Sequence, residues 1–245
     1  MSPENPRDAP ALLAEIARYP WYHTIELGDG VATPGMFDHR PVLHHYPLPE
    51  DLSGLHCLDV ATMDGYWAFE MERRGAASVT ALDLEDPEAL DWPAALRPDH
   101  DRSLDESKAE RFALAKAALG SNVERVLLSV YDLGPSLGMF DFVFCGDLLL
   151  HLKDPVTAVE NIRSVCTGSA VIANVISRFR LYEKRAIAEL DGIDSFTWWS
   201  TNMAGLVRIV RAAGFDRVDA SEPFELPFRD GGGWRGLRGV VRAYV

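Results

Sequence analysis

Carboxylates stand at the ends of short apolar runs, where they could bind the hydroxyl groups of a ligand. Asp59 lies in the run 55–60, which leads at Gly65 into a helical pattern, and Asp83 closes the run 78–84. A carboxylate fixed at such a strand end can accept hydrogen bonds from both ribose hydroxyls of a nucleoside. The alternative is a solvated acidic loop at 83–86, but the strand-end position of Asp83 favours the ligand role.

Histidines are the second group with useful chemistry, because an unperturbed pKa near neutrality suits the imidazole to proton removal. Of the seven histidines, we expect His151 and His23 to be the catalytic candidates. His151 follows the apolar run 140–145 after a short segment, and His23 lies in the aromatic sequence Trp21-Tyr22-His23. The alternative for His151 is a residue at a helix start that only hydrogen-bonds to the backbone.

The elements that position these residues alternate between apolar β-type runs and helical patterns, which predicts a parallel sheet covered on both faces. We expect strands at 55–60, 78–84, 124–130, 140–145, 169–176, 215–221 and 237–244. We expect helices at 65–74, at 104–119 between a capping box at Ser103 and a stop at Gly120, from Asp154-Pro155, and at 201–213. A glycine-rich turn at Gly231–Gly233 joins the last two strands without a helix, so these strands can pair antiparallel.

The loop from Asp59 to Gly65 resembles the acidic-x-Gly-x-Gly-x-Gly loop of class I S-adenosylmethionine-dependent methyltransferases. Ala61 and Met63 replace the first two glycines, which predicts that the backbone at Met63 does not need a positive φ. The resemblance implies an α/β, Rossmann-like class I methyltransferase fold with a seven-stranded, mostly parallel sheet and a C-terminal antiparallel hairpin strand. It also implies S-adenosyl-L-methionine (SAM) as the cofactor.

The resemblance assigns roles to residues at several strand ends. In the family, an acidic residue after the third strand accepts a hydrogen bond from the adenine amino group, and flanking apolar side chains sandwich the ring. Asp132 would take the first role, Leu84 and Tyr131 the second, and the end of the fourth strand would lie beside the methionine part. The predicted cofactor-binding residues are therefore Asp59, Ala61, Gly65, Asp83, Leu84, Tyr131, Asp132, Cys145 and Gly146.

A closer resemblance extends over the segments 21–40, 59–66, 141–151 and 204–215. These are similar to the tRNA wobble-uridine carboxymethyltransferase branch and its small-molecule relatives, which include methyltransferase-like enzymes of natural-product pathways. The tRNA enzymes carry additional N-terminal sequence and a basic character that this chain lacks. The resemblance therefore implies plain SAM and a small-molecule acceptor, with a tRNA-modifying (carboxy)methyltransferase and a non-catalytic SAM-binding subunit as alternatives.

Aromatic and polar residues outside the cofactor loop are the candidates for acceptor binding. We expect a single domain over 1–245, in which the N-terminal segment 1–45 forms a lid or substrate wall; the alternative is an arm packed on the sheet. The predicted substrate residues are Trp21, Tyr22, His39, Arg40, Trp198 and Trp199. An aromatic cluster such as the last two is also common in a hydrophobic core.

Composition argues against several classes of partner. The net charge is −13, with 37 acidic against 24 basic residues, which disfavours a nucleic-acid substrate. No apolar run approaches the roughly 20 residues of a membrane span, and the polar N-terminus predicts no signal peptide. Three cysteines without metal-binding spacing favour a reducing compartment, the cytoplasm. Asp147 and Asn174 have no third ligand at a recognisable spacing, so we expect no metal; the oligomeric state stays open, a homodimer included.

Overall fold

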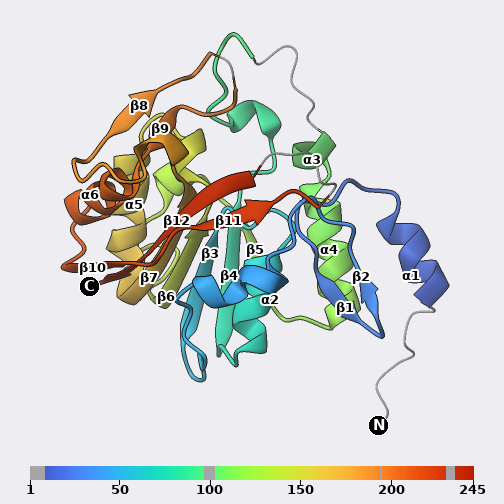
Figure 1. Cartoon of the computed structure of the whole chain (residues 1–245). Helices are drawn as coiled ribbons and strands as arrows, with labels where there is room; N and C mark the ends of the chain where they lie inside the picture. The colour runs from blue at the N-terminus through green and yellow to red at the C-terminus, as the bar shows by residue number, and fades with distance from the viewer. Residues whose placement is uncertain (1–8, 97–102, 194, 230–234) are drawn as a thin grey trace.

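The computed structural model describes residues 9–96, 103–193, 195–229 and 235–245, and is built around one large twisted sheet (Figure 1). Along the sheet the strands follow the order β10-β12-β7-β6-β3-β4-β5, and β11 also pairs with β12. Their bounds are β3 His56–Val60, β4 Ser78–Asp83, β5 Glu124–Leu127, β6 Phe140–Gly146, β7 Cys166–Val175, β10 Arg217–Ala220, β11 Phe224–Pro227 and β12 Arg235–Tyr244.

The directions of the strands confirm the predicted fold class. Strands β3 to β7 pair in parallel, whereas β12 runs antiparallel to β7, with Val240 opposite Ala173. Strand β10 is antiparallel to β12 in turn, with Val218 opposite Ala243. The sequence did not predict β11, which pairs with the first residues of β12. The predicted turn Gly231–Gly233 lies outside the described residues.

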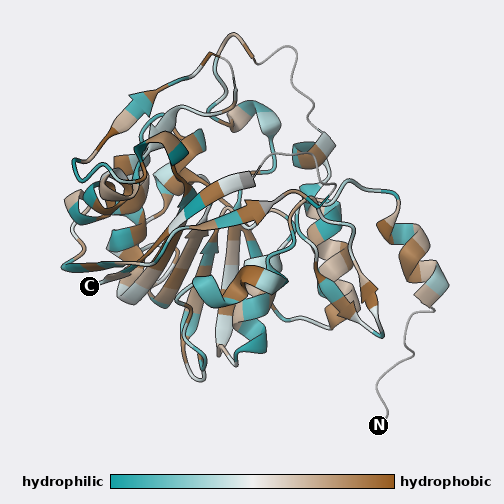
Figure 2. Cartoon of the chain, in the orientation of Figure 1, coloured by the Kyte–Doolittle hydropathy of each residue, from teal (hydrophilic) through white to brown (hydrophobic). Residues whose placement is uncertain are grey.

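Helices cover both faces of the sheet, with α5 and α6 on one side and α2 and α4 on the other, while α1 lies farther out, beyond α4 (Figure 1). Two buried clusters show why: along β6, Phe142 and Phe144 face one cluster, and Val143 and Cys145 face the other, as the two-residue repeat of a strand requires. The central strands are mostly hydrophobic in Figure 2. The helices are α1 Ala9–Ile16, α2 Tyr66–Arg73, α3 Ser103–Glu106, α4 Lys108–Leu119, α5 Pro155–Val165 and α6 Met203–Ala212.

Local signals set the ends of several helices. Gly120 ends α4 in the left-handed conformation with φ 63°, and the Asp154 side chain accepts from Thr157 N at 3.0 Å at the start of α5. The predicted helix 104–119 is divided at Ser107 into α3 and α4. Within the described ranges, none of the helices is both long enough and apolar enough to cross a membrane.

Shorter elements lie outside the large sheet. The N-terminal segment adds the hairpin of β1 Glu26–Gly28 and β2 Val31–Ala32, and later residues add the pair β8 Ala188–Leu190 and β9 Trp199–Thr201. The 3₁₀ helices are η1 Arg40–His45, η2 Pro87–Ala89, η3 Val130–Asp132, η4 Leu149–His151 and η5 Arg178–Arg180. Of these, η3 and η4 follow β5 and β6 directly and β9 contacts η4, so these three stand at the edge where a doubly wound sheet binds its ligand.

Candidate functional site

A cavity of about 680 Å³ opens at the carboxyl-end edge of the sheet. Its floor is made where parallel strands stop, because Val60, Asp83, Ser129 and Gly146 at or just after four strand ends all line it. Strands β3 and β6 are neighbours in the sheet although β4 and β5 lie between them in the chain. The cavity therefore occupies the switch point of the strand order, where open α/β sheets bind ligands.

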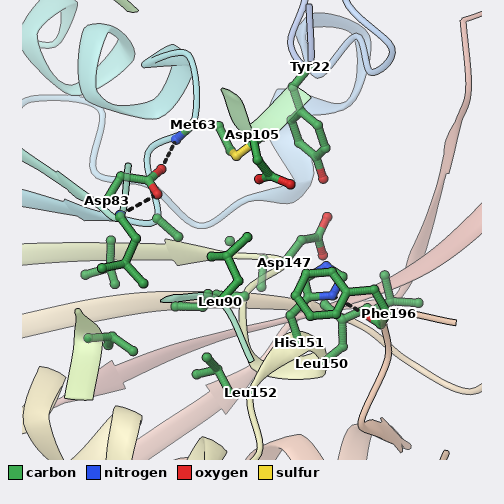
Figure 3. Close-up of a pocket in the computed structure, with 18 of the residues that line it drawn as sticks. Tyr22, Met63, Asp83, Leu90, Asp105, Asp147, Leu150, His151, Leu152 and Phe196 are labelled. Carbon is green, nitrogen blue, oxygen red and sulfur yellow. Dashed lines mark hydrogen bonds between the residues drawn. The ribbon is translucent and has the colours of Figure 1, made fainter. Parts of the chain in front are cut away.

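Asp83 is the most heavily hydrogen-bonded carboxylate of the floor. Its Oδ2 accepts from the backbone N–H of Met63 at 2.7 Å, and its Oδ1 accepts from the N–H of Leu84 at 2.7 Å (Figure 3). Oδ1 also accepts from Lys108 Nζ at 2.8 Å, and the two side chains of this ion pair are 6% and 2% exposed. The carboxylate is thus held rigidly at the place where the sequence predicted it.

The loop after β3 keeps the backbone conformation of a glycine-rich loop with few glycines. Ala61 and Met63 have φ of 62° and 53°, so the prediction that Met63 avoids a positive φ is wrong. This conformation costs a non-glycine residue about 1–2 kcal/mol. It is retained because it aims the Met63 N–H at Asp83, while Ala61 N donates to Leu82 O at 2.8 Å. Strain of this kind is typical of functional loops.

Gly65 has a separate requirement for glycine. Its φ is 96°, and a Cβ there would lie 2.4 Å from the ring of Phe69 and 2.9 Å from that of Phe112. The glycine lets the start of α2 approach these two rings closely. Gly65 does not line the cavity, so its part in this loop is to shape the backbone.

Asp59 points into the loop and is outside the cavity lining. It is 1% exposed, and its Oδ2 accepts from Thr62 Oγ1 at 2.7 Å. Burial raises the pKa of this carboxyl to about 7, although the hydrogen bond from Thr62 opposes the rise. The structure thus gives Asp59 a place beneath the loop, where it supports the turn.

The predicted cofactor residues fall into two groups. Those that line the cavity are Ala61, Asp83, Leu84, Tyr131 and Gly146, and those that do not are Asp59, Gly65, Asp132 and Cys145. Asp132 is exposed, because β5 stops at Leu127 and the chain then turns into η3, which leaves Ser129, Val130 and Tyr131 to form the wall. Cys145 is fully buried in the sheet.

An apolar pocket lies beyond Asp83, between Leu84, Leu90, Tyr131 and Leu152. The Tyr131 hydroxyl donates to Asp91 Oδ2 at 2.6 Å and accepts from Asp154 N at 3.1 Å. Burial, and then the hydrogen bond to Asp91, raise the pKa of this hydroxyl, so it stays protonated. The ring is therefore a fixed, neutral wall suited to a flat heterocycle.

At the end of β6, Asp147 faces the middle of the cavity (Figure 3). It has a φ of 48°, and its Oδ2 accepts from Arg238 Nε at 2.7 Å, with Arg238 only 1% exposed. The hydroxyl of Tyr22 and the carboxylate of Asp105 point toward the same region (Figure 3). Burial and the nearby Asp147 raise the pKa of Tyr22, which keeps that hydroxyl neutral.

His151 also lies on the cavity wall (Figure 3). Its Nδ1 is hydrogen-bonded to the backbone carbonyl of Phe196, whose ring lies 4.6 Å from the imidazole between centroids. Since a carbonyl oxygen only accepts, Nδ1 must carry the proton, and Nε2 is the acceptor nitrogen of the neutral ring. An imidazole fixed in this tautomer can remove a proton from a bound molecule.

His23, the other catalytic candidate, also lines the cavity but is only 4% exposed. Its Nδ1 is bonded to Asp64 Oδ1, and Asp64 Oδ2 accepts from the N–H groups of Tyr22 and His23 at 2.9 Å each. Asp64 belongs to the loop after β3, so it fastens the N-terminal segment to that loop. Sequence reasoning missed Asp64, although an acidic residue inside the loop was a visible signal.

The predicted substrate residues are also divided. Tyr22, His39 and Trp199 line the cavity, whereas Trp21, Arg40 and Trp198 do not. Trp21 is buried in the core and donates through Nε1 to Ile16 O at 2.9 Å, and Arg40 pairs with Asp38 at 2.7 Å on the surface. The indole of Trp198 donates to the carbonyl of Asp91 and holds the 196–200 segment over the cavity.

Sequence reasoning also missed polar cavity residues from loops, helices and β12: Asp91, Asp105, Lys108, Ser129 and Arg238. Of these, Ser129 alone follows a strand end, without a recognisable motif. Lys108 has the pattern of an ordinary helix lysine until the fold brings it to Asp83. Among the described residues, no group of three or more His, Cys, Asp or Glu side chains is placed to hold a metal ion.

The strand order with its antiparallel β12 is that of the class I SAM-dependent methyltransferase fold. No protein-family model and no curated protein matches the sequence. Among solved structures, the chain is similar to the N-terminal domain of EvdMO1 with S-adenosylhomocysteine (SAH) bound. The TM-score is 0.59, the identity is 17%, and 96% of each chain is covered.

Two further solved structures support the same fold. A SAM-dependent methyltransferase from Mesorhizobium loti has a TM-score of 0.51 and 15% identity, covering 84% of this chain and 97% of its own. The 1,6-didemethyltoxoflavin-N1-methyltransferase of Burkholderia thailandensis, with 1,6-didemethyltoxoflavin and S-adenosylhomocysteine bound, has a TM-score of 0.52 and 18% identity, covering 78% and 71%. At these identities the likeness establishes the fold alone.

Proposed function

We propose that the chain is an enzyme that transfers the methyl group of SAM to a small-molecule acceptor without a metal ion. The observation that carries the proposal is the rigid Asp83 carboxylate at the switch point of a class I methyltransferase fold, inside a cavity of about 680 Å³. Ligand cavities commonly have volumes of about 300–1,000 Å³. The lining of this cavity extends from the apolar surface at Tyr131 to the wall at His151.

The lining residues suit the parts of SAM in order. Asp83 is an acceptor for ribose hydroxyls, and the apolar surfaces of Leu84, Tyr131 and Leu152 suit the adenine ring. Gly146 at the end of β6 leaves room for the methionine part, beside the strained loop after β3. When bound, SAM supplies a methyl group on a positively charged sulfur, which a nucleophile can attack.

The chain's own residues would position the acceptor and take its proton. The N-terminal segment through Tyr22 and His39, and the 196–200 segment through Phe196 and Trp199, wall the remaining space. Alignment of two bound reactants is the main contribution that such a site makes to a displacement reaction. His151 would act as the general base, since its tautomer leaves Nε2 to accept the proton of a hydroxyl or amine. His23 is the second candidate for this role.

The acceptor class follows from the electrostatics and from one solved structure. A net charge of −13 opposes tRNA binding, because phosphate backbones are bound by clustered basic residues. The methyltransferase from Burkholderia thailandensis holds a small heterocycle together with its cofactor product. We therefore favour a small organic acceptor over the wobble-uridine substrate of the tRNA branch. The three cysteines without metal-binding spacing support a location in the cytoplasm.

The test has two stages, binding and transfer. In calorimetry, SAH should bind the wild-type protein and lose at least 100-fold in affinity with Asp83→Ala. Glu85→Ala, a change at an exposed carboxylate two residues further on, should bind SAH like the wild type. Unchanged affinity in Asp83→Ala would refute the placement of the ribose.

In the second stage, the protein is incubated with methyl-labelled SAM and a panel of phenols, amines and carboxylic acids. Transfer of label to at least one small molecule supports the enzyme assignment. Binding of SAM without transfer to any acceptor would instead favour a non-catalytic subunit. Transfer only to tRNA, with strong salt dependence, would favour the tRNA-modifying alternative.

A further inference from the structure

The buried pair of Asp83 and Lys108 limits what Asp83 can do for a bound nucleoside. An ionised carboxylate offers about four lone-pair positions on its two oxygens. Oδ1 already accepts from Leu84 N at 2.7 Å and Lys108 Nζ at 2.8 Å, and Oδ2 accepts from Met63 N at 2.7 Å. One position, on Oδ2, is left. Asp83 can thus accept one ribose hydroxyl and not the two that the sequence predicted.

Lys108 is placed to serve the second ribose oxygen. Its side chain is 2% exposed and lines the same cavity as Asp83. An ammonium has three N–H donors, and in the described part of the chain the hydrogen-bond partner of Lys108 Nζ is Asp83 Oδ1. Two donors thus remain beside the position of the ribose.

Lys108 cannot leave Asp83 at a low cost in free energy when a ligand binds. Moving Nζ away from Asp83 without a new partner would leave a buried charge unpaired, which is strongly unfavourable. Lys108 is also the first residue of α4, one residue after the break at Ser107, so its backbone is fixed by the helix. Retaining the pair and donating to the ligand satisfies both buried groups.

Resting on the proposed function, we propose that Lys108 is a ribose-binding residue that divides the ribose diol with Asp83. One hydroxyl donates to Asp83 Oδ2, and the ammonium of Lys108 donates to the oxygen of the other. The two residues together recognise a vicinal diol through opposite hydrogen-bonding roles. The site therefore selects a ribonucleoside over both of its deoxy forms.

The test compares SAH with its 2′-deoxy and 3′-deoxy analogues in calorimetry. Hydrogen bonds to charged groups are strong enough that the wild type should bind each analogue about 10-fold or more weakly than SAH. In Lys108→Met, which keeps an aliphatic side chain of similar length but no donor, SAH itself should weaken about 10-fold. In this variant, the analogue that lacks the hydroxyl contacted by Lys108 should bind as well as SAH. The analogue that lacks the hydroxyl contacted by Asp83 should still bind about 10-fold more weakly than SAH.

Controls separate this role from a general effect on folding. Lys116→Met, on the same helix α4 but outside the cavity lining, should leave all three affinities unchanged. If Lys108→Met does not fold, judged by thermal unfolding, the same comparison in Lys108→Gln should show one of the two penalties reduced. Both penalties persisting at their wild-type size in a folded Lys108 variant would overturn the inference. Failure of the wild type to bind SAH would overturn the proposed function instead.

Discussion

Replacing Asp64 with asparagine tests how the N-terminal segment is fastened to the loop after β3. The carboxylate has no exposed surface, and it is bonded to two backbone N–H groups and to the His23 ring. It also lies 4.0 Å from the buried guanidinium of Arg111. Asparagine keeps one acceptor oxygen for the two N–H groups but removes the charge and the second acceptor.

The structure allows the size of the effect to be worked out. Removing one partner of a buried ion pair costs about 3–5 kcal/mol. The lower end applies, because Arg111 keeps its bonds to Pro20 O at 2.8 Å, Ser107 Oγ at 2.9 Å and Leu104 O at 2.7 Å. We expect Asp64→Asn to lower the free energy of unfolding by about 3 kcal/mol, against a total of about 5–15 kcal/mol for a typical domain.

Urea unfolding at pH 7, followed by circular dichroism, measures this change. Asp38→Asn is the matched control, because the pair of Asp38 with Arg40 is on the surface and should contribute no more than about 1 kcal/mol. A loss below about 1 kcal/mol in Asp64→Asn would refute the view that this carboxylate anchors the N-terminal segment.

The effect should also depend on pH. Burial alone would raise the pKa of Asp64, but the charge and hydrogen bond of His23 and the charge of Arg111 hold it below its usual value. A carboxyl with a lowered pKa contributes stability that is present above the unfolded pKa and is lost as the pH falls through the folded pKa. The difference between wild type and Asp64→Asn should therefore be complete at pH 7 and shrink below about pH 4.

Three further predictions concern the same site. His151→Ala should slow methyl transfer at least 10-fold while calorimetry shows unchanged SAH affinity; undiminished turnover would remove it from the mechanism. Gly65→Ala should lower the free energy of unfolding by about 3 kcal/mol in urea, because its Cβ would meet the Phe69 ring at 2.4 Å; a neutral effect would contradict the packing. The free energy of unfolding of Asp59→Asn, relative to that of the wild type, should be higher at pH 8 than at pH 5. The reason is that burial raises the pKa of Asp59 to about 7, so that its ionisation destabilises the wild type as the pH rises; the same relative value at pH 5 and pH 8 would contradict this.

Much of the fold could be predicted because its signals are local. Runs with two-residue or helical periodicity marked the central strands within a few residues, and Gly120 and Asp154 marked helix ends through their own backbone and side-chain preferences. Strand β11 was missed because the short segment 224–227 gains its structure from pairing with β12, which lies later in the chain. Such pairing leaves little trace in a single segment.

The candidate site was predictable only where chemistry and strand ends coincide. Asp83 is such a residue, because it is the last residue of β4 and therefore lies at the carboxyl-end edge of the sheet, where it lines the cavity. Asp132 was assigned from the family resemblance, as the acidic residue after the third strand, but β5 stops at Leu127 and the turn of η3 leaves that carboxylate exposed. Lys108 and Arg238 could not be predicted as cavity residues from the sequence, because the tertiary packing of α4 and β12 brings them to the cavity.

The loop after β3 shows a different limit. A methionine at position 63 argues from sequence against a left-handed backbone, yet Met63 adopts φ 53°. The surrounding bonds, among them that from Met63 N to Asp83, outweigh the cost of about 1–2 kcal/mol for the residue. A single residue's preference cannot predict such a conformation when the network that enforces it is formed by residues elsewhere.

A crystal structure of the protein with SAH tests the central claim most directly. Our account predicts the ribose within hydrogen-bonding distance of the Asp83 carboxylate and the adenine ring against Leu84 and Tyr131. A nucleoside bound elsewhere on the molecule, with the Asp83 edge of the cavity not contacting it, would contradict the account.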